Sequence, residues 1–322
     1  MNYDEFAADL PADRTIEFTT VEKMEETFRE WGVEQPMRQL GNGSFRSALA
    51  VQSTKQADLF SDRYSTAISV YLEPPPGNVG FLFPRSASGQ FVTNGEDVGN
   101  DKLVALSDGS GADIVVPALA GSETIIVPEA RFIEMAGVLC PMAVLPEVTS
   151  IFEGDCAQLH ALRKAVADLV AQPESDVQDK DVANVIAQTI GWMGDSRCQS
   201  RPKYLSVNQA RVRVARLAQE YIEAHYSEAV HVEDLCRVTG VGVRTLQRCF
   251  REYFNLTVSD YLKTVRLDSA RRELVAAHPT ETSVTRIAMR NGCTHLGRFS
   301  VEFRERFGQS PKETLAMQAG NR

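Results

Sequence analysis

The sequence predicts an α+β protein of two domains: a β-rich N-terminal domain with flanking helices and an all-α C-terminal domain. Three observations lead to this prediction. Residues 43–127 alternate short apolar runs with turn residues, residues 208–317 show helical periodicity, and one string near the C-terminus occurs twice. The length of 322 residues also favours two domains.

The predicted domain boundary lies in a segment without hydrophobic periodicity. Residues 195–207 read DSRCQSRPKYLSV, a polar stretch that contains Pro202 and is typical of a linker. We therefore expect an N-terminal domain over 1–194 and a C-terminal domain over 208–322.

The N-terminal domain is expected to begin with a helix and continue as strands. Thr19 or Thr20 can cap a helix over 21–31, because a threonine hydroxyl accepts hydrogen bonds from free backbone amides. The following runs of alternating residues are the expected strands: 45–52, 66–72, 102–107, 112–117 and 123–128. Segments rich in Gly, Pro and Asn separate them, so a β-sandwich or barrel is predicted.

After Pro128 the pattern becomes helical. Residues 155–171 carry an apolar stripe at spacings of three and four, and a second helix is expected over 179–193. The stripe consists of Leu159, Leu162, Val166 and Leu169. A stripe this short favours the domain's own core, but it leaves a homodimer interface as an alternative.

The C-terminal domain contains an internal repeat, with an offset of 53 residues in its downstream part and 52 in its upstream part. FREYFNLTVSDYL (250–262) matches FRERFGQSPKETL (303–315), and VEDLCRVTG (232–240) matches VTRIAMRNG (284–292). Repetition at this scale indicates one supersecondary unit used twice. A periodic helix over 208–226 precedes the first copy, and a long helix over 257–276 lies between the copies.

Each copy has the pattern of a helix-turn-helix. The first helix needs a small residue where the second crosses it, and the turn favours glycine because it requires positive φ. Cys236 and Gly240 meet these needs in the first copy, and Ala288 and Gly292 meet them in the second. The turn of the second copy is expected to be one residue longer.

The second helix of each copy is anchored by apolar residues four apart, Leu246 with Phe250 and Phe299 with Phe303. Arg, Gln, Thr and His are residue types that bond to base edges or phosphates, and they occupy much of the opposite face. The candidate DNA-binding residues are Val243, Arg244, Thr245, Gln247, Arg248, Arg251, Thr294, His295, Leu296, Gly297, Arg298 and Val301.

The charge of the chain is distributed unevenly. Residues 201–322 contain 20 Lys or Arg against 13 Asp or Glu, whereas residues 1–200 contain 14 against 30. A basic C-terminal part fits a polyanionic partner, and an acidic N-terminal part argues against nucleic-acid binding there.

Residues 208–317 resemble the AraC/XylS family of bacterial transcription regulators. The resemblance rests on RTLQRCFRE (244–252), YLKTVRLDSARREL (261–274), IAMRNG (287–292) and GRFSVEFRERFGQSP (297–311). It implies a domain of seven helices in two helix-turn-helix lobes joined by a long helix. It also implies that 243–253 and 294–304 enter successive major-groove segments, about one helical turn (~34 Å) apart.

The second lobe departs from the family pattern. Cys293 stands where an aromatic residue is frequent, and Val301 stands where a basic residue is common. The resemblance therefore implies fewer phosphate contacts in this lobe than is usual.

The N-terminal part resembles the family's sensor domains, which are cupin-like β-barrels followed by helices. GNGSFRSALAV (41–51) is similar to the opening strand of such a sensor. All five histidines follow residue 159, so residues 43–127 contain none of the histidines that a cupin enzyme uses to hold its metal. We expect no metal, no cofactor and no enzymatic activity.

The predicted function is transcription regulation by binding double-stranded DNA, with a small-molecule effector at the N-terminal domain and contact with RNA polymerase. Activation is what the resemblance implies most often, although the sequence does not choose between activation and repression. No secretory signal and no membrane-spanning stretch are visible, so a cytoplasmic location is expected.

Two alternatives remain at this point. One is an enzyme that carries a helix-turn-helix, either of cupin type or for DNA repair. It lacks support because the six cysteines include no CxxC pair for a zinc site. The other is a DNA-binding protein without sequence preference, which predicts strongly salt-dependent binding.

The cysteines are expected to be buried as small apolar residues, with redox sensing as the alternative role.

Overall fold

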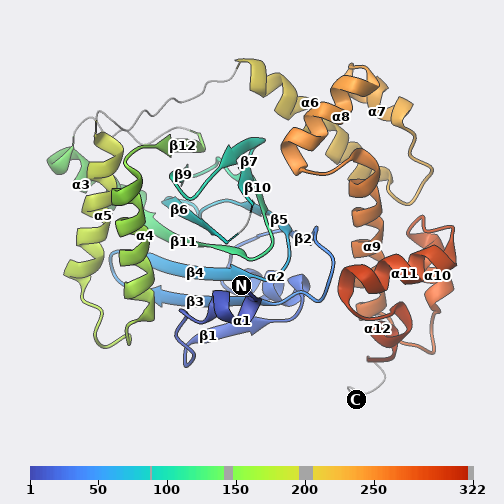
Figure 1. The fold of residues 1–322 in the computed structure, drawn as a ribbon, viewed down its shortest axis with the longest axis horizontal. Coiled ribbons are helices and arrows are strands. Elements are labelled where there is room, and N and C mark those ends of the chain that lie inside the picture. Colours follow the sequence, from blue (N-terminus) through green and yellow to red (C-terminus); the bar gives the residue numbers. More distant parts are fainter. Residues whose placement is uncertain (88, 141–147, 196–205, 318–322) are drawn as a thin grey trace. The chain divides into compact units, whose positions relative to one another are not determined.

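The computed structural model describes residues 1–87, 89–140, 148–195 and 206–317 (Figure 1). The chain folds as two compact units, each with its own core. The first unit comprises Met1–Met37, Arg46–Thr93 and Asp97–Leu205, and the second comprises Arg38–Phe45, Asn94–Glu96 and Ser206–Arg322. The predicted linker falls mostly on residues 196–205, which lie outside the described residues.

The N-terminal strands form two antiparallel sheets. The seven-stranded sheet has the order β1-β3-β4-β11-β6-β9-β12, and the five-stranded sheet has the order β2-β5-β10-β7-β8. The strands of the larger sheet are β1 (Thr15–Phe18), β3 (Ser47–Ser53), β4 (Asp58–Tyr64), β6 (Asn78–Ser86), β9 (Lys102–Leu106), β11 (Ala120–Pro128) and β12 (Ser150–Glu153). Those of the smaller sheet are β2 (Met37–Gln39), β5 (Ile68–Leu72), β7 (Phe91–Thr93), β8 (Glu96–Val98) and β10 (Ala112–Val116).

Strands were predicted at five of these positions, and each of those predictions is confirmed. The strands that were not predicted are β1, β2, β4, β6, β7, β8 and β12. Of these, β4 and β6 flank β11 in the larger sheet, and β1 precedes the run at 41–51, which therefore does not open the sheet. Among the described residues no pairing joins the two sheets into one closed barrel, and the cupin-like barrel stays a prediction.

Helices cover one face of the larger sheet. The helices of the first unit are α1 (Tyr3–Ala7), α2 (Val21–Glu30), α3 (Glu129–Leu139), α4 (Cys156–Ala171) and α5 (Asp179–Gly194). Thr20 caps α2, as predicted. The apolar stripe of α4 is buried in one core with α3, α5 and the outward face of β4, β6 and β11. The stripe therefore belongs to the unit's own core, which answers the question that the sequence left open.

The described part of 206–317 is entirely helical and contains seven helices (Figure 1). They are α6 (Ser206–His225), α7 (Val232–Thr239), α8 (Val243–Phe254), α9 (Val258–Ala276), α10 (Val284–Arg290), α11 (Leu296–Phe307) and α12 (Pro311–Met317). This confirms the predicted helical domain and the long helix between the two repeats.

Two separate apolar cores share α9. Its first half supplies Val258, Tyr261 and Val265 to a core built with α6, α7 and α8. Its second half supplies Leu267 and Leu274 to a core built with α10, α11 and α12. Figure 1 shows α6–α8 around one end of α9 and α10–α12 around the other. One continuous helix therefore belongs to both lobes.

The helix ends follow the sequence signals. Asn255 and Gly308 end α8 and α11 in the left-handed conformation, with φ of 53° and 73°. Thr257 caps α9, because its hydroxyl accepts a hydrogen bond from the amide of Asp260. Ser310 does the same for α12, where its hydroxyl accepts from the amide of Glu313.

Candidate nucleic-acid interface

The first helix-turn-helix consists of α7 and α8. Gly240 follows α7 with φ of 70°, a conformation that costs glycine little because it has no Cβ. Three residues later α8 begins, and its Leu246 and Phe250 are fully buried. The ring of Phe250 packs edge-on against Tyr261 of α9, with 5.2 Å between the centroids. The buried side of α8 is thus fixed and its other side faces outward.

The second helix-turn-helix consists of α10 and α11. Its turn runs from Asn291 to His295, and Gly292 has φ of 74°. From the glycine to the next helix it is one residue longer than the first turn, as predicted. Phe299 and Phe303 are buried, with 5.5 Å between their ring centroids. Both repeats therefore present a helix in the same way.

The candidate residues of α8 lie on its outward face. Val243, Arg244, Arg248 and Arg251 are exposed, and Thr245 and Gln247 are half-buried beside the core. The side chain of Arg248 is 58% exposed, with its Nε 4.0 Å from Glu252. A face with three exposed arginines and no buried charge suits contact with phosphates and bases.

The candidate residues of α11 and its turn divide into two groups. Thr294, His295, Gly297, Arg298 and Val301 are exposed. Leu296 instead packs against the core of the second lobe, so it supports the helix rather than facing outward. Val301 is an apolar residue on the surface, 57% exposed.

Superposing the repeats residue by residue identifies two further residues of the outward face. Both α8 and α11 have 12 residues and begin 53 positions apart. Arg251 then corresponds to Arg304, and Gln247 corresponds to Ser300, and both partners in α11 are exposed. Ser300 and Arg304 were not among the predicted DNA-binding residues, although the offset of 53 between the repeats was sufficient to locate them.

An acidic residue lies beside the arginine of each outward face. Nε of Arg298 donates to Oε1 of Glu302 at 2.9 Å, and Nζ of Lys263 lies 3.7 Å from the same oxygen. In α8, Glu252 holds Nη1 of Arg211 at 3.2 Å. These pairs are exposed, so each stabilises the fold only weakly.

The two lobes touch at the second turn. Nε of Arg266, on α9, donates to the carbonyl oxygen of Tyr226 at 2.8 Å, and Nη2 donates to that of Glu228. A Cβ on Gly292 would lie 2.8 Å from the same carbonyl of Tyr226. The turn of the second lobe therefore packs directly on the loop between α6 and α7.

Cysteines in this unit are structural. Cys249 is buried, and Cys236 and Cys293 pack at the edges of the two cores. Burial raises the pKa of the Cys293 thiol to about 11, so it stays protonated near neutral pH. A protonated thiol is a poor nucleophile, which disfavours redox sensing at this position.

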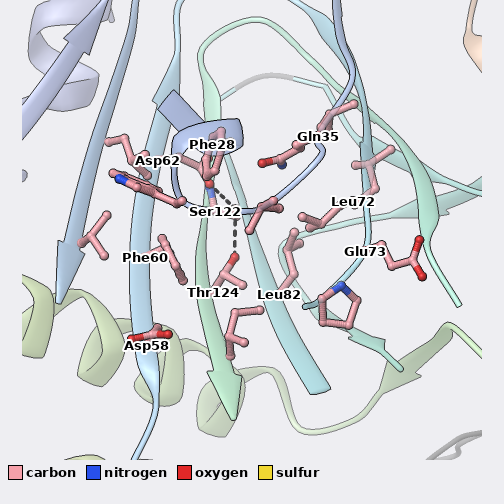
Figure 2. A pocket seen from close by; sticks show the side chains of 18 of the residues that line it. Phe28, Gln35, Asp58, Phe60, Asp62, Leu72, Glu73, Leu82, Ser122 and Thr124 are labelled. Carbon is pink, nitrogen blue, oxygen red and sulfur yellow. Dashed lines mark hydrogen bonds between the residues drawn. The ribbon is translucent and has the colours of Figure 1, made fainter. Parts of the chain in front are cut away.

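A second candidate site is a cavity of about 400 Å³ in the first unit (Figure 2). It lies between the inward faces of the two sheets and is lined by residues from β3, β4, β5, β6, β7, β10 and β11 together with α2. Among the residues that the structure describes, no helix is long and apolar enough to cross a membrane, and no three metal-ligating side chains converge.

The class defined by this geometry is a double helix-turn-helix domain. A family model for the helix-turn-helix domain matches residues 235–317. The probable thc operon regulatory protein of Rhodococcus erythropolis is 41% identical over 102 residues, 32% of this chain and 31% of that protein. The HTH-type transcriptional activator RhaS of Escherichia coli is 29% identical over 157 residues, 48% of this chain and 54% of RhaS.

Two solved structures are also similar to this chain. A probable AraC family transcriptional regulator from Rhodopseudomonas palustris is 33% identical, covering 32% of this chain and 95% of that one, with a TM-score of 0.31. The AraC-like transcriptional activator CuxR covers 86% of this chain and 99% of its own, at 14% identity and a TM-score of 0.41.

Residues 235–317 match the helix-turn-helix domain, and the C-terminal domain is similar to the corresponding parts of the regulators named above. The matched part spans 31% of the length of the first curated relative and 54% of the second.

Proposed function

We propose that this protein is a sequence-specific transcription regulator that binds double-stranded DNA through α8 and α11. In this proposal 1–194 is a sensing and dimerisation domain with a cupin-like architecture, 195–207 is a linker and 208–322 binds DNA. The protein works in the cytoplasm, responds to a small molecule and contacts RNA polymerase as an activator. It is not an enzyme.

The observation that carries this proposal is the pair of outward faces joined by one rigid helix. With 19 residues, α9 is about 28 Å long at 1.5 Å per residue. That length is close to the ~34 Å between successive major-groove segments on one face of B-DNA. The regulators named above, which share this domain, support the same reading.

Activation by an effector requires that the effector binds one conformation more tightly than another. The cavity between the two sheets supplies a volume in which a small molecule can bind. It lies in the unit that does not carry the reading helices, so the proposed signal passes between units.

Selection of duplexes from a random pool at physiological salt tests the proposal. We expect enrichment of two short elements about one helical turn apart. The Lys164→Ala variant lacks an exposed charge on α4 in the first unit, outside the proposed DNA-binding faces. It is the control and should select the same two elements. Binding without an enriched motif, lost steeply as salt rises, would reduce the protein to a non-specific DNA binder.

A further inference from the structure

The cavity in the first unit has an unusual distribution of charge. Its 23 lining residues include three carboxylates and no Lys, Arg or His. Most of the others are apolar, including five aromatic residues. The aromatic residues are Phe28, Trp31, Phe60, Tyr64 and Phe91. Anions are therefore repelled from this space, and a cation gains both from the carboxylates and from the faces of the rings.

The alternation of side chains along the strands explains why the pocket exists. In β4 the residues Leu59 and Arg63 point to the helix-covered face, and Asp58, Phe60 and Asp62 point to the cavity. In β11 the cavity side carries Ser122 and Thr124. Polar residues thus occupy core positions between two sheets, where they cost stability unless hydrogen bonds or a bound ligand satisfy them.

Asp62 is held in position by β11. Its Oδ1 accepts a hydrogen bond from the backbone amide of Ser122 at 2.8 Å, and its Oδ2 accepts from the Ser122 hydroxyl at 2.7 Å (Figure 2). This arrangement requires Gly121, because a Cβ there would lie 1.9 Å from the carbonyl oxygen of Asp62. Each carboxylate oxygen keeps a further lone pair for a ligand.

Two other polar groups face the cavity without a protein partner among the described residues. The side chain of Gln35 is 9% exposed and makes no hydrogen bond there, and the Asp58 carboxylate makes none. The third carboxylate, Glu73, accepts one hydrogen bond from Tyr71. Figure 2 shows Asp58 and Asp62 apart from each other along β4 and Glu73 across the pocket, so the three carboxylates do not form a metal cage.

We propose that this cavity binds an organic cation, a primary amine on an apolar or aromatic body, through Asp62 with Gln35 and Glu73 as further polar contacts. That such a ligand is the effector rests on the proposed function. The binding itself does not, because it is measured without DNA. Trp31 is the expected rim of the site, since it lines the cavity and is 45% exposed.

Binding should strengthen as the pH rises through about 6. Burial raises the pKa of Asp62 to about 6, against hydrogen bonds from Ser122 and the nearby charge of Arg63, which lower it. Glu123 on β11 raises it further, and β3 on the other side brings no charged side chain. Below this pH the carboxyl is neutral and loses its attraction for an amine, which itself stays protonated up to about pH 10.

The test is a binding titration of the full chain with a panel of aryl- and alkylamines, among them tryptamine. Each amine is paired with its alcohol and its carboxylate, such as tryptophol and indole-3-acetate. The readout is calorimetry, with Trp31 fluorescence for the alkyl members in a Trp192→Phe background, which removes the other tryptophan. We expect at least one amine to bind at least tenfold more tightly than its matched alcohol, and the carboxylates to bind weakest.

Variants sharpen the test. Asp62→Asn should weaken amine binding at least tenfold and leave alcohol binding unchanged, whereas Asp97→Asn removes an exposed acid outside the pocket and should change neither. The proposal is overturned if no amine binds better than its alcohol, or if Asp62→Asn and Asp97→Asn behave alike. DNA selection is a separate assay, so failure of the regulator proposal is distinguished from failure of this one.

Discussion

Arg298 and Glu302, one turn apart on the outward face of α11, form an ion pair with 2.9 Å between Nε and Oε1. The corresponding residue pair of α8, Thr245 and Cys249, has no charge at all. The helices α8 and α11 thus hold equivalent places in the two repeats but differ in charge at this pair of positions. In the proposed complex, Arg298 exchanges the Glu302 carboxylate for a phosphate or a base.

Replacement of Arg248 by alanine tests base reading by α8. We expect Arg248→Ala to cost about 1–3 kcal/mol on the selected site, as for a lost contact to a base edge. The measurement is a mobility-shift or fluorescence titration on specific and random duplexes. Equal weakening on both would show that Arg248 touches only phosphate.

Alanine substitutions of Arg298 and Val301 test which of these two side chains of α11 contributes more to DNA binding. Arg298→Ala should weaken binding to the selected site more than Val301→Ala, because only the arginine offers hydrogen-bond donors. Both side chains are exposed, so neither change is expected to disturb the core. The reverse order would mean that Val301 makes an apolar contact to a thymine methyl and that α11 is rotated relative to α8.

Glu302→Gln should strengthen DNA binding. The substitution keeps the shape of the side chain and releases Arg298 and Lys263 from a shared carboxylate. Exposed pairs of this kind are worth about 0.2–1 kcal/mol, so the gain is about two- to fivefold at low salt. Glu281→Gln, an exposed acid outside α11, is the matched control. Unchanged affinity would show that Arg298 stays away from the DNA.

The two turn glycines should differ in their tolerance of alanine. Both have positive φ, which costs alanine about 1–2 kcal/mol. A Cβ on Gly240 meets nothing within 4 Å, whereas one on Gly292 meets the carbonyl of Tyr226 at 2.8 Å. Gly292→Ala should therefore destabilise its lobe by at least about 1 kcal/mol more. Amide hydrogen exchange in α8 and α11 measures both effects, and equal losses would contradict the contact.

A substitution of Glu123 tests how much its buried ion pair with Arg63 stabilises the first unit. Its Oε1 lies 2.7 Å from Nη2 of Arg63, and both side chains are fully buried. Glu123→Ala leaves the guanidinium with the Asp9 carboxylate and the carbonyls of Asp62 and Ser122, so we expect about 3–5 kcal/mol of lost stability from the broken buried ion pair. Thermal denaturation of the full chain, with Glu17→Ala as an exposed control, checks this. A loss no larger than that of the control would show that Asp9 and the two carbonyls satisfy Arg63.

The helical domain was predictable because its signals are local. Periodicity, the caps Thr257 and Ser310, and the glycines of the turns all act within a few residues of their own position. The strands β4 and β6 were not found, since Asp58 and Asp62 interrupt the apolar pattern of one and Gly80 and Pro84 that of the other.

The cavity could not be predicted from the sequence for a related reason. Asp62 meets Ser122 only because β4 pairs with β11, 60 positions away along the chain. Long-range pairing of this kind leaves no mark in the spacing of either segment. From the sequence alone, Asp58 and Asp62 of β4 therefore look like surface residues, although in the fold they face the second sheet.

Because α9 runs uninterrupted through both cores, its length sets the angular phase between the two reading helices. Each residue added to an α-helix turns everything beyond it by about 100° and moves it by about 1.5 Å. A single insertion near Arg266 would break the contact between the lobes at Tyr226 and, in the proposed complex, aim α8 and α11 at different sides of a duplex. Substitutions along this helix are thus constrained by packing, and under the proposed function its residue count is also constrained by the pitch of DNA.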